Sequence, residues 1–143
     1  MSSKTWYFTG TAKWAKVETP DPKYGKYSID LYMDEHNMAK YEESGAQLKI
    51  RTNDEGEQYV SFQRPHVMLS KGELVTLGPP DMLSADGSPL PKGTLIGNGS
   101  VVTVRTDVFD TQKGKGTRLT GIRVDNLVEY RKREVDEDID TPF

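Results

Sequence analysis

The sequence contains no cysteine, no long apolar run and only two histidines among its 143 residues. Without cysteine the chain cannot form disulfides or thiolate metal sites, which excludes a small secreted fold held together by such links. No segment has enough consecutive apolar residues to span a bilayer, and residues 1–8 do not resemble a signal peptide. We therefore expect a soluble, cytoplasmic protein, which for a viral chain means the host cytoplasm.

Motifs for catalysis and cofactor binding are also missing. His36 and His66 are thirty residues apart, with neither metal-ligand spacing nor a nucleophile nearby. Residues 97–99 (Gly-Asn-Gly) lack the third glycine of a dinucleotide site, and residues 114–116 (Gly-Lys-Gly) lack the Ser or Thr of a phosphate loop. We expect no enzyme activity, no cofactor and no metal. A metal-dependent nuclease is the alternative, built from the scattered carboxylates of Asp21, Asp30, Asp107 and Asp110.

Size and composition indicate one domain with a modest hydrophobic core. The chain has a mass of 16.1 kDa and a mean hydropathy of −0.69, which is low for a globular protein. Aromatic residues nevertheless make up 9% of the sequence, which argues against wholesale disorder. Several of the aromatic side chains are therefore expected on the surface.

The last ten residues differ from the rest of the chain. They carry five carboxylates and no cation, and they end on Pro142-Phe143. Because like charges repel and little apolar surface is present, we predict a folded domain over residues 1–133 and a disordered acidic tail over residues 134–143.

Charge divides between the two parts. All 19 Lys and Arg lie in residues 1–133 together with 17 of the 22 acidic residues, so the domain has a net charge of +2. An acidic tail on a weakly basic domain can occupy the place of another polyanion, and nucleic acid is the obvious candidate. The alternative is that the tail only aids solubility.

The first half of the chain predicts two strands and a helix. Residues 5–17 are rich in aromatic and β-branched residues and end at a Pro-Asp-Pro turn over 20–22. Apolar residues alternate from 25 to 33, which predicts a strand with one face inward. Asp34 is positioned to cap a helix over 35–43, with Met38 and Tyr41 as its apolar contacts and Gly45 as its stop.

The second half predicts a hairpin, a long loop and a second hairpin. Residues 48–52 and 58–64 flank a turn cluster over 53–57. Residues 65–93 hold five of the eight prolines and are expected to be a loop with at most a short strand at 74–77. Strands over 100–109 and 117–130 follow, joined by a basic tip over 110–116. Together these elements predict an all-β fold, a small closed antiparallel barrel with one short helix, for which the oligonucleotide-binding (OB) fold is the best analogy.

The first strand leaves two arrangements open. Its largest rings share one face, opposite Tyr7 and Lys13. If those rings fill the barrel, Tyr7 and Lys13 face solvent. If the strand instead bends at Gly10, its halves exchange faces and Trp14 becomes exposed beside Lys16. The rings on the shared face are Trp6, Phe8 and Trp14.

Rings and cations recur together on neighbouring predicted strands. A single ring is typical of core packing, and a single cation is typical of a solvated surface. Binding of single-stranded nucleic acid needs both, because bases stack on rings for about 1–3 kcal/mol each while cations contact the phosphates. An RNA-binding module and a virion or scaffold protein are the alternatives. The predicted nucleic-acid-binding residues are Tyr7, Lys13, Trp14, Lys16, Lys26, Tyr32, Lys49, Arg51, Arg105, Phe109, Lys113, Lys115, Arg118 and Arg123.

Three short stretches precede the acidic tail: residues 25–31 (GKYSIDL), residues 95–100 (LIGNGS) leading into the strand with Arg105, and residues 127–129 (LVE). In their order, these stretches and the tail resemble the replication single-stranded DNA-binding proteins of T-seven-like phages. The chain and its helix are shorter than in that family, and the last four residues (DTPF) are also similar to the tip of cellular bacterial single-strand binding proteins.

The resemblance implies an OB barrel with a helix after the second strand and a DNA-binding role for Arg105. It also implies single-stranded DNA as a partner, homodimerisation, and a tail that recruits the replication polymerase and helicase-primase. The tail residues to which this role falls by position are Asp136, Glu137, Asp138, Ile139, Asp140, Pro142 and Phe143.

Overall fold

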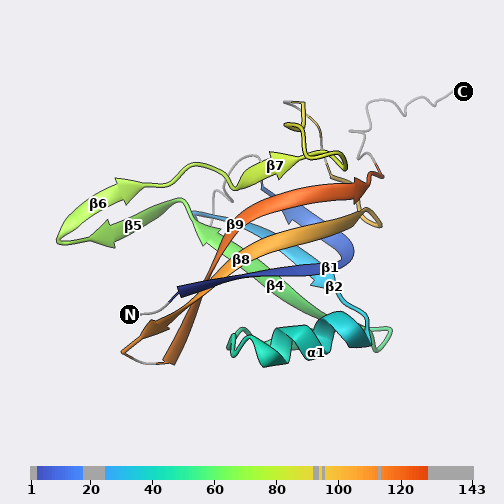
Figure 1. Ribbon diagram of the computed structural model, residues 1–143, viewed down its shortest axis with the longest axis horizontal. Coiled ribbons are helices and arrows are strands. Elements are labelled where there is room, and N and C mark those ends of the chain that lie inside the picture. The colour runs from blue at the N-terminus through green and yellow to red at the C-terminus, as the bar shows by residue number, and fades with distance from the viewer. Residues whose placement is uncertain (1–2, 18–24, 92–93, 95, 113, 129–143) are drawn as a thin grey trace, which may run out of the picture.

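The computed structural model describes residues 3–17, 25–91, 94, 96–112 and 114–128. Figure 1 shows the elements that these residues form. In chain order they are β1 (Ser3–Lys16), β2 (Lys26–Tyr32), α1 (Glu35–Glu43), β3 (Ile50–Thr52), β4 (Gln58–Pro65), β5 (Val67–Ser70), β6 (Glu73–Thr76), β7 (Asp81–Leu83), β8 (Val101–Thr111) and β9 (Gly114–Asn126).

Seven strands form one sheet in the order β3-β4-β2-β1-β8-β9-β7, and β5 pairs with β6 in a separate hairpin. The expected mostly β fold with one short helix is confirmed. The expectation of a wholly antiparallel barrel is wrong at β7, which runs parallel to β9, because the chain crosses over from β4 before it pairs. The predicted closure of the barrel is not found either, because among the described residues no ladder joins β4 to β9. A hydrogen bond from Arg64 Nη1 of β4 to the Leu119 carbonyl of β9, 3.3 Å long, links these two strands.

The predicted loop over 65–93 contains three short strands. Only the one near 74–77 was expected, and it is β6. β5 and β6 are joined through Lys71 and Gly72, both with positive φ (52° and 82°), as a tight hairpin turn requires. Figure 1 shows this hairpin projecting from the body of the molecule.

The other strand predictions agree with the structure to within a few residues. The tip over 110–116 is shorter than expected, because Asp110 pairs with Lys115 and Thr111 with Gly114 in the β8–β9 ladder. The predicted turn at 20–22, residues 129 and 130 of the last predicted strand, and the tail all lie outside the described residues.

The helix begins and ends where the sequence predicts. Asp34 caps α1 by accepting a hydrogen bond from the Asn37 backbone N at 2.9 Å, and Gly45, with φ 79°, follows its last turn. Tyr41 is buried, but Asn37 is buried in place of the predicted Met38, because its Oδ1 accepts a hydrogen bond from the backbone N of Thr9. No helix within the described part of the chain has the length and apolar character to cross a membrane.

The core lies between the inner face of the sheet and α1. Phe8 of β1 is fully buried, stacks on Phe62 of β4 (ring centroids 5.7 Å apart) and meets Tyr41 edge-on at 5.8 Å. Alternate residues of β2, β8 and β9 complete it; they include Ile29, Leu31, Val102, Val104, Leu119 and Ile122. Each such side chain stabilises the fold by about 1.5–3 kcal/mol through burial. The opposite set of residues on each strand is thereby turned to the outer face of the sheet.

We predict that Gly10→Ala destabilises the fold by about 1–3 kcal/mol, the usual cost of overpacking. A Cβ at Gly10 would lie 2.4 Å from the Tyr32 carbonyl oxygen of β2, a backbone atom that cannot move aside. Gly78→Ala is the matched control, since a Cβ there meets nothing within 4 Å. Urea unfolding should separate the two variants, and equal midpoints would contradict the prediction.

Candidate nucleic-acid interface

The strand register places outward side chains of β1, β2, β8 and β9 next to one another on the side of the sheet away from the core, called here the outer face. Tyr7 of β1 pairs with Arg105 of β8, which pairs in turn with Gly121 of β9. On the other side of β1, Lys13 pairs with Asp30 of β2. These residues are far apart in sequence, so the surface exists only through the pairing of the strands.

The structure decides between the two arrangements of the first strand. Trp6 and Phe8 face the core, whereas Tyr7 is 52% exposed. Trp14 is 64% exposed because the β1–β2 register shifts between Lys13 and Lys16 and Trp14 adopts a left-handed φ of 53°. Its backbone N donates to Asn98 Oδ1 at 2.9 Å, which holds the bulge. The change of face therefore occurs at Trp14 and not at Gly10.

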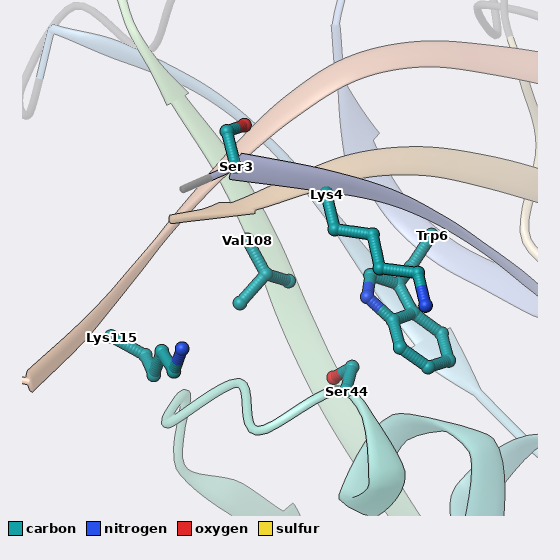
Figure 2. A pocket seen from close by; sticks show the side chains of 6 residues that line it. All are labelled: Ser3, Lys4, Trp6, Ser44, Val108 and Lys115. Carbon is teal, nitrogen blue, oxygen red and sulfur yellow. The ribbon is translucent and has the colours of Figure 1, made fainter. Parts of the chain in front are cut away.

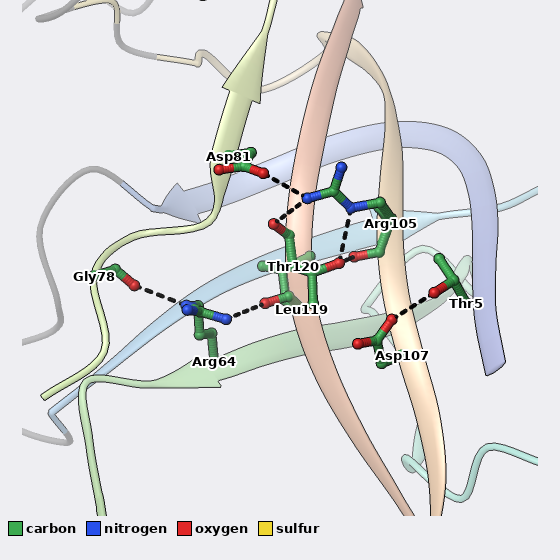
Figure 3. A network of polar contacts seen from close by, with 8 residues as sticks. All are labelled: Thr5, Arg64, Gly78, Asp81, Arg105, Asp107, Leu119 and Thr120. Carbon is green, nitrogen blue, oxygen red and sulfur yellow. Dashed lines mark hydrogen bonds and ion pairs between the residues drawn. The ribbon is translucent and has the colours of Figure 1, made fainter. Parts of the chain in front are cut away.

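Arg105 lies at the centre of the outer face in a network of polar contacts (Figure 3). Its Nε donates to Thr120 Oγ1 at 3.0 Å, and its Nη2 donates to the Thr120 carbonyl at 2.9 Å and to Asp81 Oδ2 at 2.7 Å. Thr120 is the extra residue of a bulge, since Arg105 pairs with Gly121 and the next residue of β8 pairs with Leu119. Such bulges re-aim side chains at functional sites. A pocket of about 160 Å³ opens here, lined by Tyr7, Leu83, Thr103, Arg105, Gly121, Ile122 and Arg123.

A second group of rings and cations lies on β1, β2 and β4. The Tyr32 ring has the Lys13 ammonium 4.6 Å from its centroid and stacks on Tyr59 at 4.8 Å. Lys13 Nζ also lies 3.9 Å from Glu57. Tyr59 was missed in the sequence analysis, although its alternation with the buried Val60 and Phe62 was the signal for an outward position.

Phe109 and Arg118 form a third group at the far end of β8 and β9. The Arg118 guanidinium lies 5.6 Å from the centre of the Phe109 ring, and its Nη2 lies 3.6 Å from the Met68 sulfur of β5. The Phe109 ring also lies against Gly116, where a Cβ would come within 2.5 Å of it. One part of the ring is therefore covered by the protein itself.

The remaining predicted residues are placed less closely together. Lys26 is half-buried on the outward side of β2, and Arg123 donates to Asp125 at 2.7 Å beside the central pocket. Lys113 lies outside the described residues. The exposed cations near the ends of β1 and β3 are Lys16, Lys49 and Arg51.

Lys115 lies apart from the outer face. Figure 2 shows it near Ser44, at the end of α1. It forms an ion pair with Asp110 and lines a second pocket, of about 390 Å³, with Ser3, Lys4, Trp6, Ser44 and Val108. Lys115 packs here against the turn at Gly45, and its backbone N donates to Gln47 at 2.8 Å.

The aspartates of the nuclease alternative occupy separate places. Asp30 accepts a hydrogen bond from Ser61, Asp107 accepts one from Thr5 at 2.8 Å, and Asp110 pairs with Lys115. Asp21 lies outside the described residues. Within the described residues, no three His, Cys, Asp or Glu side chains gather closely enough to hold a metal ion.

The fold matches solved structures of phage proteins over nearly the whole chain. The crystal structure of gp2.5, a single-stranded DNA-binding protein encoded by bacteriophage T7, superposes with a TM-score of 0.67 at 17% identity, covering 96% of this chain and 97% of that chain. This chain has the fold of a phage single-stranded DNA-binding protein. The predicted resemblance is thus confirmed at the level of the fold.

Structures of the single-stranded DNA-binding protein from bacteriophage Enc34 match as well. The protein alone gives a TM-score of 0.58 at 13% identity, with 94% of this chain and 88% of that chain covered. Its complex with single-stranded DNA gives 0.55 at 14% identity, with 85% and 86% covered. By sequence, the chain matches no family model and no curated protein.

We predict that Asp30→Asn stabilises the fold at pH 7. Partial burial raises the pKa of the Asp30 carboxyl, although the Ser61 hydrogen bond and the nearby Arg51 lower it. Because the folded state binds the proton more tightly than the unfolded chain, stability is lost as pH rises through the folded pKa. The asparagine keeps an acceptor for Ser61 without the charge. Thermal unfolding should give the variant a higher melting temperature than the original protein at pH 7 and the same melting temperature below pH 3.8. A lower melting temperature of the variant at pH 7 would contradict this.

Proposed function

We infer that this protein binds single-stranded DNA through its outer face, without sequence preference, in phage DNA replication, recombination or repair. The observation that carries this proposal is the match of fold to the phage proteins over nearly the whole chain. The outer face supports it, because the exposed rings of Tyr7 and Trp14 lie on the same surface as Arg105 and Lys13.

The chemistry of the outer face explains why the binding would ignore sequence. Every base has a flat face, so stacking on Tyr7 or Trp14 accepts any of them. Every nucleotide has a phosphate, so cations such as Arg123 and Lys13 gain from any sequence. The proposal involves no reaction step and no cofactor.

The three groups of the outer face suggest a path for the strand. Phe109 and Arg118 stand at one end, Tyr7 and Arg105 in the middle, and the Lys13 group at the other end. In the last group the Tyr32 ring contacts both Lys13 and Tyr59, and Tyr59 is half-buried. Lys13 would then turn from the Tyr32 ring to a phosphate.

We predict that Trp14 reports DNA binding and that Trp6 does not. Trp14 is exposed on the outer face, whereas Trp6 stacks on Phe8 beneath it. Poly-dT should therefore quench the fluorescence of Trp6→Phe strongly and that of Trp14→Phe weakly. The affinity should fall with salt, with a log-log slope of roughly −0.7 for each phosphate neutralised.

Two outcomes of this titration would count against the proposal. Absence of binding at low salt would leave a virion or scaffold role, and a flat salt response would remove the phosphate contacts. Competition between matched DNA and RNA oligonucleotides tests the RNA alternative, because the 2′-hydroxyl is the group that differs along the strand. Preference for RNA would overturn the choice of DNA.

The acidic tail is proposed to bind replication proteins, polymerase and helicase-primase, and to compete with DNA for the basic domain. We predict that deleting residues 134–143 tightens DNA binding several-fold at low salt, since it removes five negative charges from a domain of net charge +2. The difference should shrink as salt is raised, and the binding of the replication proteins should be lost. Unchanged affinity at low salt would contradict the competition.

A further inference from the structure

The hydrogen bonds of Arg105 leave little of its charged edge for a phosphate. An arginine side chain has five N–H donors, and a bidentate phosphate contact uses two neighbouring ones. In this protein the Nε donor and both Nη2 donors are directed to Thr120 Oγ1, the Thr120 carbonyl and Asp81 Oδ2. Figure 3 shows that these contacts come from one side of the guanidinium. Only the donors of Nη1 are not used by these contacts.

The plane of the same guanidinium is supported from below. A Cβ built on Gly121 would lie 2.9 Å from Arg105 Cζ, 3.0 Å from Nη2 and 3.2 Å from Nε. Nearly equal distances to three atoms of one plane place that point above the plane and not at its edge. Arg105 therefore lies flat on the backbone of β9 at Gly121, with its side chain 32% exposed.

The surroundings suit a flat ligand with a polar edge. Tyr7, the register partner of Arg105 on β1, is 52% exposed and lines the same pocket of about 160 Å³. The half-buried Leu83 adds apolar surface, and Arg123 supplies a charged group at the same pocket. Nucleobases stack on guanidinium planes as well as on aromatic rings.

We propose that Arg105 binds a nucleobase by its plane instead of a phosphate by its charge, and that Asp81 positions it for this. The pocket with Tyr7 is then a subsite for one base, while Arg123 contacts a phosphate beside it. Asp81 comes from β7, the strand that pairs parallel to β9, and fixes the guanidinium from the side opposite β8. This inference rests on the proposed function and assigns the parts of the strand to particular side chains.

The test compares full-length variants on two probes, oligo-dT and an abasic oligonucleotide of the same length, which has the phosphates but no bases. Arg105→Lys keeps the charge and removes the planar guanidinium. Gly121→Ala keeps both charges of the Arg105–Asp81 pair, but its Cβ displaces the guanidinium from the backbone of β9. Each should weaken oligo-dT binding by roughly 5- to 150-fold, the contribution of one stacked base, with the salt slope unchanged. Binding of the abasic probe should not change.

Asp81→Asn should likewise weaken oligo-dT binding at an unchanged salt slope and leave binding of the abasic probe unchanged. A merely structural role of Asp81 would weaken the binding of both probes. Arg123→Gln is the matched phosphate control and should flatten the slope by roughly 0.7 on both probes. Thermal unfolding of each variant verifies that it is folded. Gly121→Ala gives a second answer if Arg105→Lys unfolds.

Two results would overturn the inference while leaving the proposed function in place. One is tighter binding and a steeper slope for Asp81→Asn, which would make Asp81 a competitor of phosphate on Arg105. The other is wild-type affinity for oligo-dT in both Arg105→Lys and Gly121→Ala. If the unaltered protein binds neither oligo-dT nor the abasic probe at low salt, both this inference and the proposed function are overturned.

Discussion

The pairing of β1 with β8 is the constraint on which the remaining structure depends. It runs without interruption from Ser3 opposite Phe109 to Thr11 opposite Val101. Since paired residues share a face of the sheet, a slip of one residue would set the inward residues of one strand opposite the outward residues of the other. One of the two strands would then have to reverse its faces, so that either Tyr7 would replace Phe8 in the core or Arg105 would replace Val104. The hydrophobic energy of the core therefore also fixes the composition of the outer face.

Two of the irregularities in strand pairing lie at residues of the outer face. The left-handed conformation of Trp14 costs roughly 1–2 kcal/mol, yet it turns a large apolar ring to solvent beside Lys13 and Lys16. The bulge at Thr120 supplies two hydrogen bonds to Arg105 that a regular strand would not offer. Both interruptions concern residues of the proposed DNA path, as expected if local strain is retained for function.

Glycines fit the same description, because three of them allow close approach across the sheet. Gly10 lets β1 approach the Tyr32 carbonyl of β2, Gly116 gives room to the Phe109 ring, and Gly121 carries the guanidinium of Arg105. The backbone at these three positions is unexceptional, and only the missing Cβ matters. On the outer face, two of these glycines thereby let the Phe109 ring and the Arg105 guanidinium lie close to the backbone of β9.

The strands with clear alternation, the helix over 35–43 and the outward direction of most predicted residues could all be predicted from the sequence. These features depend on neighbours along the chain: the period of two in β2, the cap at Asp34 and the stop at Gly45. Tyr59 could also have been found from its buried neighbours Val60 and Phe62. The hairpin of β5 and β6 was less accessible, because its turn at Lys71-Gly72 lies within a segment rich in proline.

Other features depend on contacts between distant parts of the chain. Asp81 and Arg105 are 24 positions apart in the sequence and meet because β7 pairs parallel to β9. No local sequence pattern predicts this pairing. The exposure of Trp14 depends on a hydrogen bond to Asn98, 84 positions away, and the seat of Arg105 depends on a glycine in another strand. Local preferences set which face a side chain takes, but partners across the sheet set its contacts, because those contacts form only when distant strands pair.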